Sequence, residues 1–210
     1  MDSRSLLRKE RAALCDTLSS LGPDAPTLCE GWTTADLAAH MVVREREPLA
    51  AAGILLPGPF ADYNRRRIQV AKAGDYQRLI EWLRGGPYGL WRLGPMQAVN
   101  VGEYFVHHED ARRANGMDPR PPDPDLDAAL WRMVRMTGRR QLRPLRGFGV
   151  LAQGPDGRGA TLRKGFPEAT ITGAPGEIVL YLMGRKQAAR VELSGSELAV
   201  TALDAAPLRA

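Results

Sequence analysis

Most of the first 142 residues follow a helical repeat of apolar side chains, and this repeat is broken at glycine and proline. The repeat predicts helices over residues 3–21, 33–47, 61–73, 75–84, 95–115 and 125–142. Thr33 and Asp36 have the spacing of a capping box, which favours a helix start at Thr33. A chain with several apolar helix stripes must bury them against one another, so we predict a helical bundle.

The pattern changes at Gly147. The segment FGVLAQGPDGRGATLRKG alternates apolar and polar residues around a turn at Pro155-Asp156-Gly157, which predicts a β-hairpin. A strand at 169–172 and a helix at 177–183 should follow, and VELSG and ELAVTAL then suggest two strands or a strand and a turn. We therefore predict an α+β chain with two domains: a helical bundle over 1–145, and a small α+β domain over 146–210 that packs on it.

The distribution of charge argues against nucleic-acid binding. The net charge is +5, but Lys and Arg exceed Asp and Glu by only 21 to 18 up to Leu145 and by 8 to 6 after it. The excess is spread along the chain rather than gathered in one basic segment.

The apolar segments and the cysteines indicate a cytoplasmic protein. No apolar run approaches the ~20 residues that span a bilayer, and the first residues lack the apolar core of a signal peptide. Cys15 and Cys29 form no CxxC pair, so we expect reduced thiols.

The histidines indicate where a metal could bind. Glu103 and His107 are four residues apart in a predicted helix, so they share a face. His40 lies in another predicted helix, and an imidazole from a facing helix would complete the three-ligand set of a divalent metal with one open position. Asp110 lies on the Glu103–His107 face and could orient the imidazole as an outer-shell partner.

The same residues also have ordinary structural explanations. Glu103 and His107 could form a surface pair, with Asp110 bound to Arg112 or Arg113. His40 has apolar neighbours, as a hydrogen-bonded core histidine would. His108 is turned by about 100° from His107, and we expect it in an outer-shell or surface position.

Two segments resemble a known superfamily. GWTTADLAAHM resembles the W-(S/T)-x-x-D-L-x-x-H signature of DinB-like four-helix bundles. NVGEYFVHHEDARRA resembles the E-x-x-x-H helix of the N-terminal domain of mycothiol-dependent maleylpyruvate isomerases. The resemblance implies a DinB-like four-helix bundle with a small C-terminal domain. It also implies a divalent metal, generally zinc, held by His40, Glu103 and His107.

Within this superfamily, the chain resembles an uncharacterised actinobacterial metal-binding subgroup. Its 25 arginines against 4 lysines are typical of GC-rich coding, which agrees with such a source.

The resemblance also implies a function. We expect a mycothiol-dependent transferase or isomerase in which a metal-bound thiolate attacks a small electrophile. Two alternatives stay open: a metal-dependent hydrolase that activates water, and a non-catalytic, metal-stabilised binding or regulatory module. The same ligand types also occur in non-haem iron oxygenases, but a helical bundle is a poor host for that site.

The expected partners are a small thiol and a small electrophile, with no nucleic acid and no membrane, and a homodimer stays open. An anionic substrate would need cationic contacts. The candidates are Arg65, Arg66, Arg67, Arg139 and Arg140.

Overall fold

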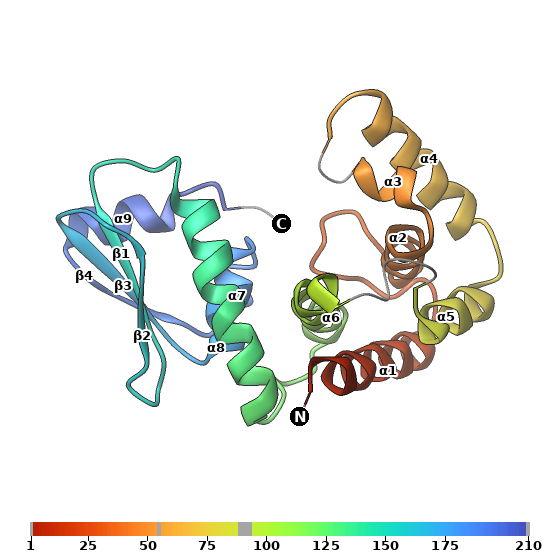
Figure 1. The fold of residues 1–210 in the computed structure, drawn as a ribbon, viewed down its shortest axis with the longest axis horizontal. Helices are drawn as coiled ribbons and strands as arrows, with labels where there is room; N and C mark the ends of the chain where they lie inside the picture. The colour runs from red at the N-terminus through yellow and green to blue at the C-terminus, as the bar shows by residue number, and fades with distance from the viewer. Residues whose placement is uncertain (1, 54–55, 88–93, 209–210) are drawn as a thin grey trace. The chain divides into compact units, whose positions relative to one another are not determined.

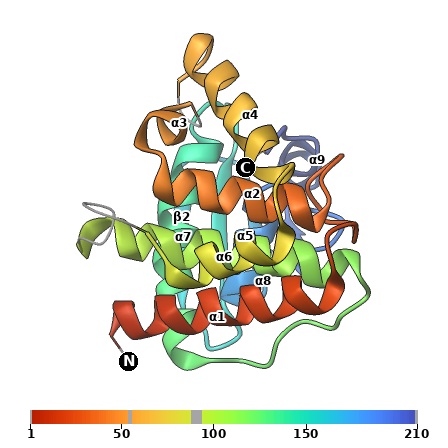
Figure 2. The same cartoon turned by 90° about the vertical axis from the view of Figure 1, so that its right-hand side faces the viewer.

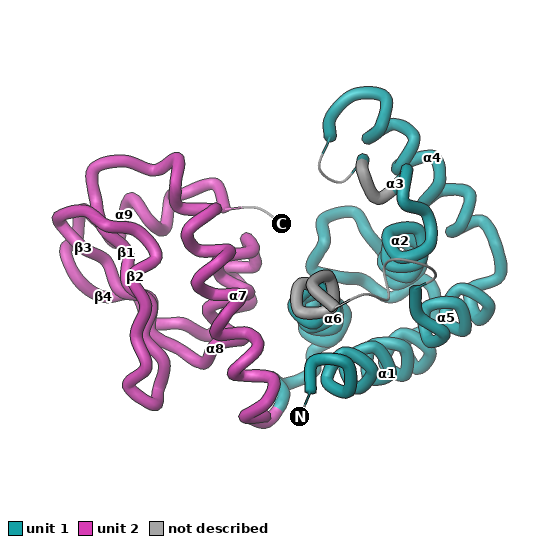
Figure 3. The backbone as a smooth tube through the Cα atoms, in the orientation of Figure 1, with its two compact units in different colours: residues 1–120 teal, residues 121–210 magenta. Residues whose placement is uncertain are grey.

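The computed structural model describes residues 2–53, 56–87 and 94–208, apart from the side chains of 51–52 and 94–99. The chain divides into two compact units, Met1–Arg120 and Pro121–Ala210 (Figure 3). The first unit is helical, and the second combines helices with a four-stranded sheet (Figure 1). The predicted α+β class with a helical bundle is confirmed.

Unit 1 contains six helices within its described residues. They are α1 (Ser3–Leu21), α2 (Thr34–Arg46), α3 (Pro48–Ala52), α4 (Pro59–Lys72), α5 (Tyr76–Gly85) and α6 (Gly94–Ala114). Helix α1 packs against α5 and α6, and α2 packs against α4 and α5. In Figure 2, α1, α2, α5 and α6 run side by side as the bundle.

Local capping explains where these helices begin. The Asp2 carboxylate accepts a hydrogen bond from the Ser5 backbone N–H at 2.7 Å, which satisfies an orphan donor at the start of α1. The predicted capping residues start α2, where the Asp36 carboxylate accepts from the Thr33 backbone N–H at 2.9 Å. Asp75 caps α5 as Asp2 caps α1: its carboxylate accepts from the Arg78 backbone N–H at 2.7 Å.

A buried polar triad joins three helices of the bundle. Arg11 of α1 donates from Nε to the Tyr104 hydroxyl of α6 at 2.9 Å and from Nη2 to Glu45 of α2 at 2.9 Å. Glu45 is 3 % exposed and Tyr104 is fully buried. Glu45 follows Arg44 and Tyr104 follows Glu103 in the chain. The triad therefore holds the backbone of α2 beside Arg44 and the backbone of α6 beside Glu103.

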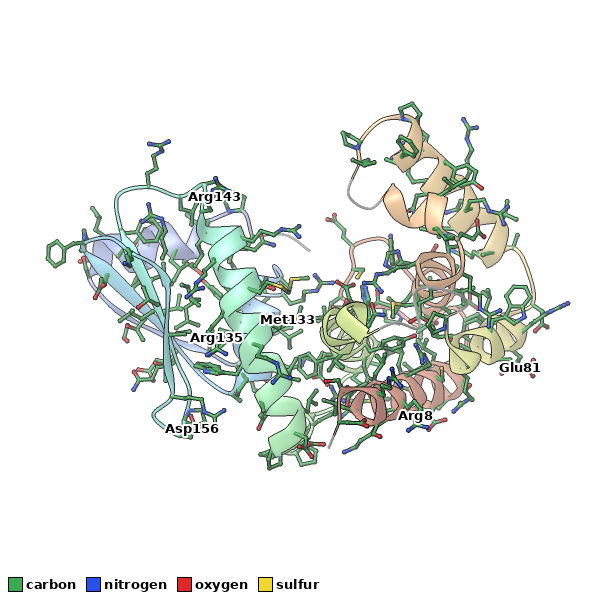
Figure 4. All side chains as sticks on the ribbon, viewed as in Figure 1. Arg8, Glu81, Met133, Arg135, Arg143 and Asp156 are labelled. Carbon is green, nitrogen blue, oxygen red and sulfur yellow. The ribbon has the colours of Figure 1, made fainter. Side chains whose placement is uncertain are left out.

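Unit 2 has a small mixed sheet. Its elements are α7 (Pro124–Leu142), β1 (Gly149–Gln153), β2 (Gly159–Arg163), β3 (Glu168–Thr172), α8 (Pro175–Leu182), β4 (Glu192–Gly195) and α9 (Glu197–Asp204). The strand order is β2-β1-β3-β4, with β1 and β3 parallel and the other pairs antiparallel. The predicted hairpin is β1–β2, and Asp156 lies at its turn (Figure 4).

The unit boundary lies before α7. Helix α7 contacts α8 and β2, which places it in unit 2 and not in the helical bundle. The predicted boundary at 145/146 therefore coincides with the end of α7 rather than with the division between units. The apolar stripe of α7, which consists of Leu126, Leu130, Trp131 and Val134, is buried. A sequence stripe shows that a helix needs a partner but does not identify the partner.

The segment ELAVTAL is a helix and not a strand. Ala199 and Leu203 are buried and four residues apart, so α9 places them on one face, where it contacts β3 and β4. Apolar segments this short carry too few periods to separate the two structures. None of the helices in the described parts of the chain combines the length and the apolar character that a membrane span requires.

Candidate metal centre

His107 of α6 lies at the centre of a group of polar side chains. Its Nδ1 is 3.0 Å from Oδ2 of Asp110, and its Nε2 is 3.8 Å from Oε2 of Glu103. The three residues occur at i, i+4 and i+7 of one helix, so they share a face. His107 is 7 % exposed and Asp110 is fully buried. The two ring nitrogens therefore face two different carboxylates.

His40 of α2 reaches the same place from the facing helix. Its ring meets the ring of His107 edge-on, with the centroids 5.3 Å apart, and the indole of Trp32 lies 5.1 Å away on centroids. Desolvation, followed by the charges of His107 and Arg44, holds the pKa of His40 well below its usual value. At neutral pH the ring is uncharged and has a nitrogen lone pair for a metal. As a whole residue, His40 is partly exposed.

Asp110 connects this face of α6 to the loop before α2. Its Oδ2 accepts from Nδ1 of His107 and lies 3.2 Å from the thiol of Cys29, which donates to it. The Asp110 backbone carbonyl also accepts from the Leu28 backbone N–H at 3.1 Å. The carboxylate is thus held from two sides.

The pKa of His107 reflects this setting. Burial opposes the charged imidazole most strongly, but hydrogen bonds with Asp110 and Cys29 and the charges of Asp110 and Glu103 together raise the pKa of His107 to about 9. In the metal-free protein both ring nitrogens therefore carry a proton at neutral pH. A metal that binds Nε2 would displace one of these protons.

Arg44 supplies the cation of the site. It follows His40 by one helical turn, and its Nε lies 3.8 Å from Oε2 of Glu103. Its Nη1 donates to Oδ1 of Asn100 on α6 at 2.9 Å. The side chain is 14 % exposed, so the guanidinium is held against α6 rather than free in solvent.

The donor set fits a divalent metal of the zinc type. Two imidazoles and one carboxylate are ordinary zinc ligands, and the Asp110 contact leaves Nε2 of His107 as its ligating nitrogen. Of the three predicted residues, His40 and Glu103 each lie beside His107, but the three do not form a group of ligand atoms as close as that of Cys29, His107 and Asp110. The role of His40, Glu103 and His107 as ligands stays a prediction.

A second grouping overlaps the first. Among the described residues, Cys29, His107 and Asp110 have metal-capable atoms within 4.8 Å of one another. Both short contacts in this group meet at the single atom Oδ2 of Asp110, as hydrogen bonds to one acceptor do. The grouping is therefore explained by hydrogen bonding without a metal.

The other sequence candidates lie elsewhere. His108 is 3 % exposed, and its Nε2 is hydrogen-bonded to Oγ1 of Thr17 on α1 at 2.8 Å, so it faces away from His107 and not toward solvent. Arg113 pairs with Glu109, with Nε 2.7 Å from Oε2.

The arginines that we named as candidate anion contacts have other surroundings. Arg67 makes a two-point ion pair with Glu47, at 2.6 and 2.8 Å, and Arg65 pairs with Asp62. Arg66 is exposed on α4. Arg139 and Arg140 are exposed on α7 of unit 2. Sequence reasoning missed Arg44 and Cys29, although the four-residue spacing from His40 could have identified Arg44.

Unit 2 contains a separate surface cavity of about 260 Å³. It is lined by Pro124, Asp127, Trp131, Pro155, Asp156, Arg158 and Pro175. None of the predicted metal ligands lies in it.

Residues 5–90 match the family model of the mycothiol maleylpyruvate isomerase N-terminal domain. For this part of the chain the predicted superfamily is confirmed. The match includes His40 and ends before Glu103 and His107. No curated protein matches the chain.

Two solved structures share the maleylpyruvate isomerase fold with this chain. They are the crystal structure of a mycothiol-dependent maleylpyruvate isomerase and that of a variant in which one histidine is replaced by alanine, with TM-scores of 0.57 and 0.58. Each is 16 % identical, and each comparison covers 92 % of this chain and 93 % of the other. At this identity the likeness establishes the fold. The more specific actinobacterial subgroup stays a prediction.

Proposed function

We propose that this protein is a metal-dependent enzyme that uses mycothiol to isomerise, or to transfer the thiol to, a small anionic electrophile. One observation carries the proposal: His40 and Glu103 both lie beside His107 in the helical unit of a chain with the maleylpyruvate isomerase fold. The two solved relatives are named for a reaction that depends on mycothiol and acts on maleylpyruvate, and that reaction is the first to test here.

The metal would be a divalent ion, of the zinc class by ligand chemistry, held by His40, Glu103 and His107. When bound, such an ion acts as a Lewis acid and favours the deprotonated, nucleophilic form of a thiol. Asp110 fixes the ring orientation of His107 by accepting from Nδ1.

The isomerisation needs no oxidant and no net proton. A thiolate sulfur adds to one carbon of a conjugated cis double bond, and the electron pair moves to the carbonyl oxygen. The former double bond is then single and rotates. When the pair returns, the carbon–sulfur bond breaks and the thiolate leaves the trans product.

Arg44 is suited to hold the substrate during these steps. It is a partly exposed guanidinium beside Glu103, and a carboxylate substrate matches its planar donor set. Asn100 holds the guanidinium in place through its side-chain oxygen. We assign to Arg44 the anion contact for which Arg65–Arg67 and Arg139–Arg140 were the sequence candidates.

The test is an isomerase assay with purified, zinc-loaded protein, maleylpyruvate and mycothiol. The proposal expects turnover that requires both the thiol and the metal and is lost in His107→Ala. Arg44→Gln should raise KM by about 10- to 100-fold with metal content unchanged, since a charged hydrogen bond contributes about 1.5–3 kcal/mol. Turnover of an ester or amide without any thiol would instead identify a hydrolase. A protein that holds metal but has no activity on any thiol–electrophile pair would be a binding module.

A further inference from the structure

We propose that Cys29 is a positioning residue of the metal site: its thiol holds the Asp110 carboxylate, and that carboxylate orients His107. The inference rests on the proposed metal site. Cys29 lies in the loop between α1 and α2, outside both helices that supply the candidate ligands.

The loop around Cys29 has a defined shape. The Trp32 backbone N–H donates to the Cys29 carbonyl at 2.9 Å, and the Cys29 backbone N–H donates to the Thr27 hydroxyl at 3.2 Å. The loop is also attached to α6. Leu28 donates to the Asp110 carbonyl, and the Asn115 side-chain amide donates to the carbonyl of Pro26 at 2.9 Å. The thiol is therefore presented to α6 by a fixed backbone.

The Cys29 thiol contacts the same carboxylate oxygen that accepts the hydrogen bond from His107. Cys29 Sγ and His107 Nδ1 lie 3.2 and 3.0 Å from the same oxygen, Oδ2 of Asp110. Asp110 is fully buried, so its side chain cannot turn to water without a cost. A donor on each side of Oδ2 restricts rotation of the carboxylate. This keeps Nδ1 of His107 engaged and leaves Nε2 for the metal.

The alternative role for Cys29 is direct metal ligation together with Asp110 and His107. In that role, the Cys29 thiolate, Asp110 Oδ2 and His107 Nδ1 would all bind the metal. Both hydrogen bonds to Asp110 Oδ2 would then be lost. Direct ligation would also turn the ligating nitrogen away from Glu103 and His40. The two roles predict different effects of substituting Cys29 on zinc affinity, and different absorption spectra of the cobalt-substituted protein.

The experiment measures zinc affinity by competition with a chromophoric chelator for the wild type, Cys29→Ala, Cys29→Ser and Asp110→Asn. Loss of an outer-shell partner costs about 10- to 100-fold in metal affinity. We expect that range for Asp110→Asn and about tenfold for Cys29→Ala, with recovery in Cys29→Ser because a hydroxyl also donates to a carboxylate. Cys15→Ala is the matched control. Cys15 is a buried thiol on α1 whose Sγ donates to the Ile80 carbonyl, and its loss should leave zinc affinity unchanged.

Two further readouts separate the outcomes. The melting temperature of each metal-free variant shows whether a change in affinity reflects unfolding. In the metal-free protein, the Nδ1 proton of His107 should give a protected, hydrogen-bonded NMR signal in the wild type and Cys29→Ser, with faster exchange in Cys29→Ala. This signal tests the inference even if the wild type binds no zinc, a result that would defeat only the proposed metal site.

Unchanged zinc affinity and an unchanged His107 proton signal in Cys29→Ala would overturn the inference. So would a sulfur-to-metal charge-transfer band in the cobalt-substituted protein that disappears in Cys29→Ser, because Cys29 would then be a ligand.

Discussion

The buried triad of Arg11, Glu45 and Tyr104 gives the sharpest prediction about stability. Replacing Arg11 with methionine keeps much of the side-chain volume but removes the guanidinium. Glu45, 3 % exposed, would then be a buried carboxylate without its 2.9 Å partner. Removing one member of a buried ion pair costs about 3–5 kcal/mol. Since a domain is stable by about 5–15 kcal/mol, the variant should lose a large share of the free energy of unfolding.

The assay is urea unfolding followed by circular dichroism, with two comparison variants. Arg65→Met makes the same substitution in the exposed Arg65–Asp62 pair of α4, where the loss should stay below about 1 kcal/mol. The double variant Arg11→Met/Glu45→Leu removes both charges and should be more stable than Arg11→Met alone, since an apolar pair can replace a buried ion pair. The reasoning is refuted if Arg11→Met costs no more than Arg65→Met, or if the double variant is no better than the single one.

Three more predictions concern the thiols, the pH dependence and the core of unit 2. Because Cys15 is fully buried and burial raises its pKa to about 11, iodoacetamide should label Cys29 first and Cys15 only after unfolding, as peptide mass mapping would show. Burial opposes the charge of Asp36, but hydrogen bonds from Lys72 and Thr33 lower its pKa below 3.8. The ionised Asp36 carboxylate therefore stabilises the fold fully above pH 3.8, and this stabilisation is lost as the pH falls through the lower pKa of the folded state. Asp36→Asn should reduce the free energy of unfolding by about 1 kcal/mol at pH 7 and by progressively less as the protein is titrated with acid. A difference between wild type and variant that stays constant with pH would contradict this. In Gly138→Ala the new methyl would lie 2.7 Å from Cδ1 of Leu162. Calorimetry should therefore show unit 2 destabilised by about 1–3 kcal/mol. An unchanged unfolding transition would show that the Leu162 side chain moves aside without cost.

The helices could be predicted from the sequence because their causes are local. The apolar stripe of α1, the capping residues Thr33 and Asp36 of α2, and the turn before β2 act within a few residues. The partner of α7 and the helical state of ELAVTAL could not be predicted in this way. Both depend on which buried surface a short apolar stripe meets, and that surface is formed by residues distant in sequence.

In the candidate site, too, the contacts within one helix could be predicted from the sequence, whereas those between distant segments could not. The face shared by Glu103, His107 and Asp110 follows from helix spacing. The contact of His40 with this face depends on how α2 and α6 pack, and the family resemblance supplied it where spacing alone could not. The Cys29 contact with Asp110 joins residues 81 apart in the chain through a loop, and no local pattern indicates it.

The proposed function requires a metal held by His40, Glu103 and His107. The decisive measurement is the metal content per chain, by mass spectrometry, of untagged protein and of His40→Ala, Glu103→Ala and His107→Ala. The account predicts about one zinc per wild-type chain, as three-ligand sites hold, and loss of most of it in each variant. A wild type that takes up no metal after soaking and desalting, or variants that all retain a full equivalent, would contradict it.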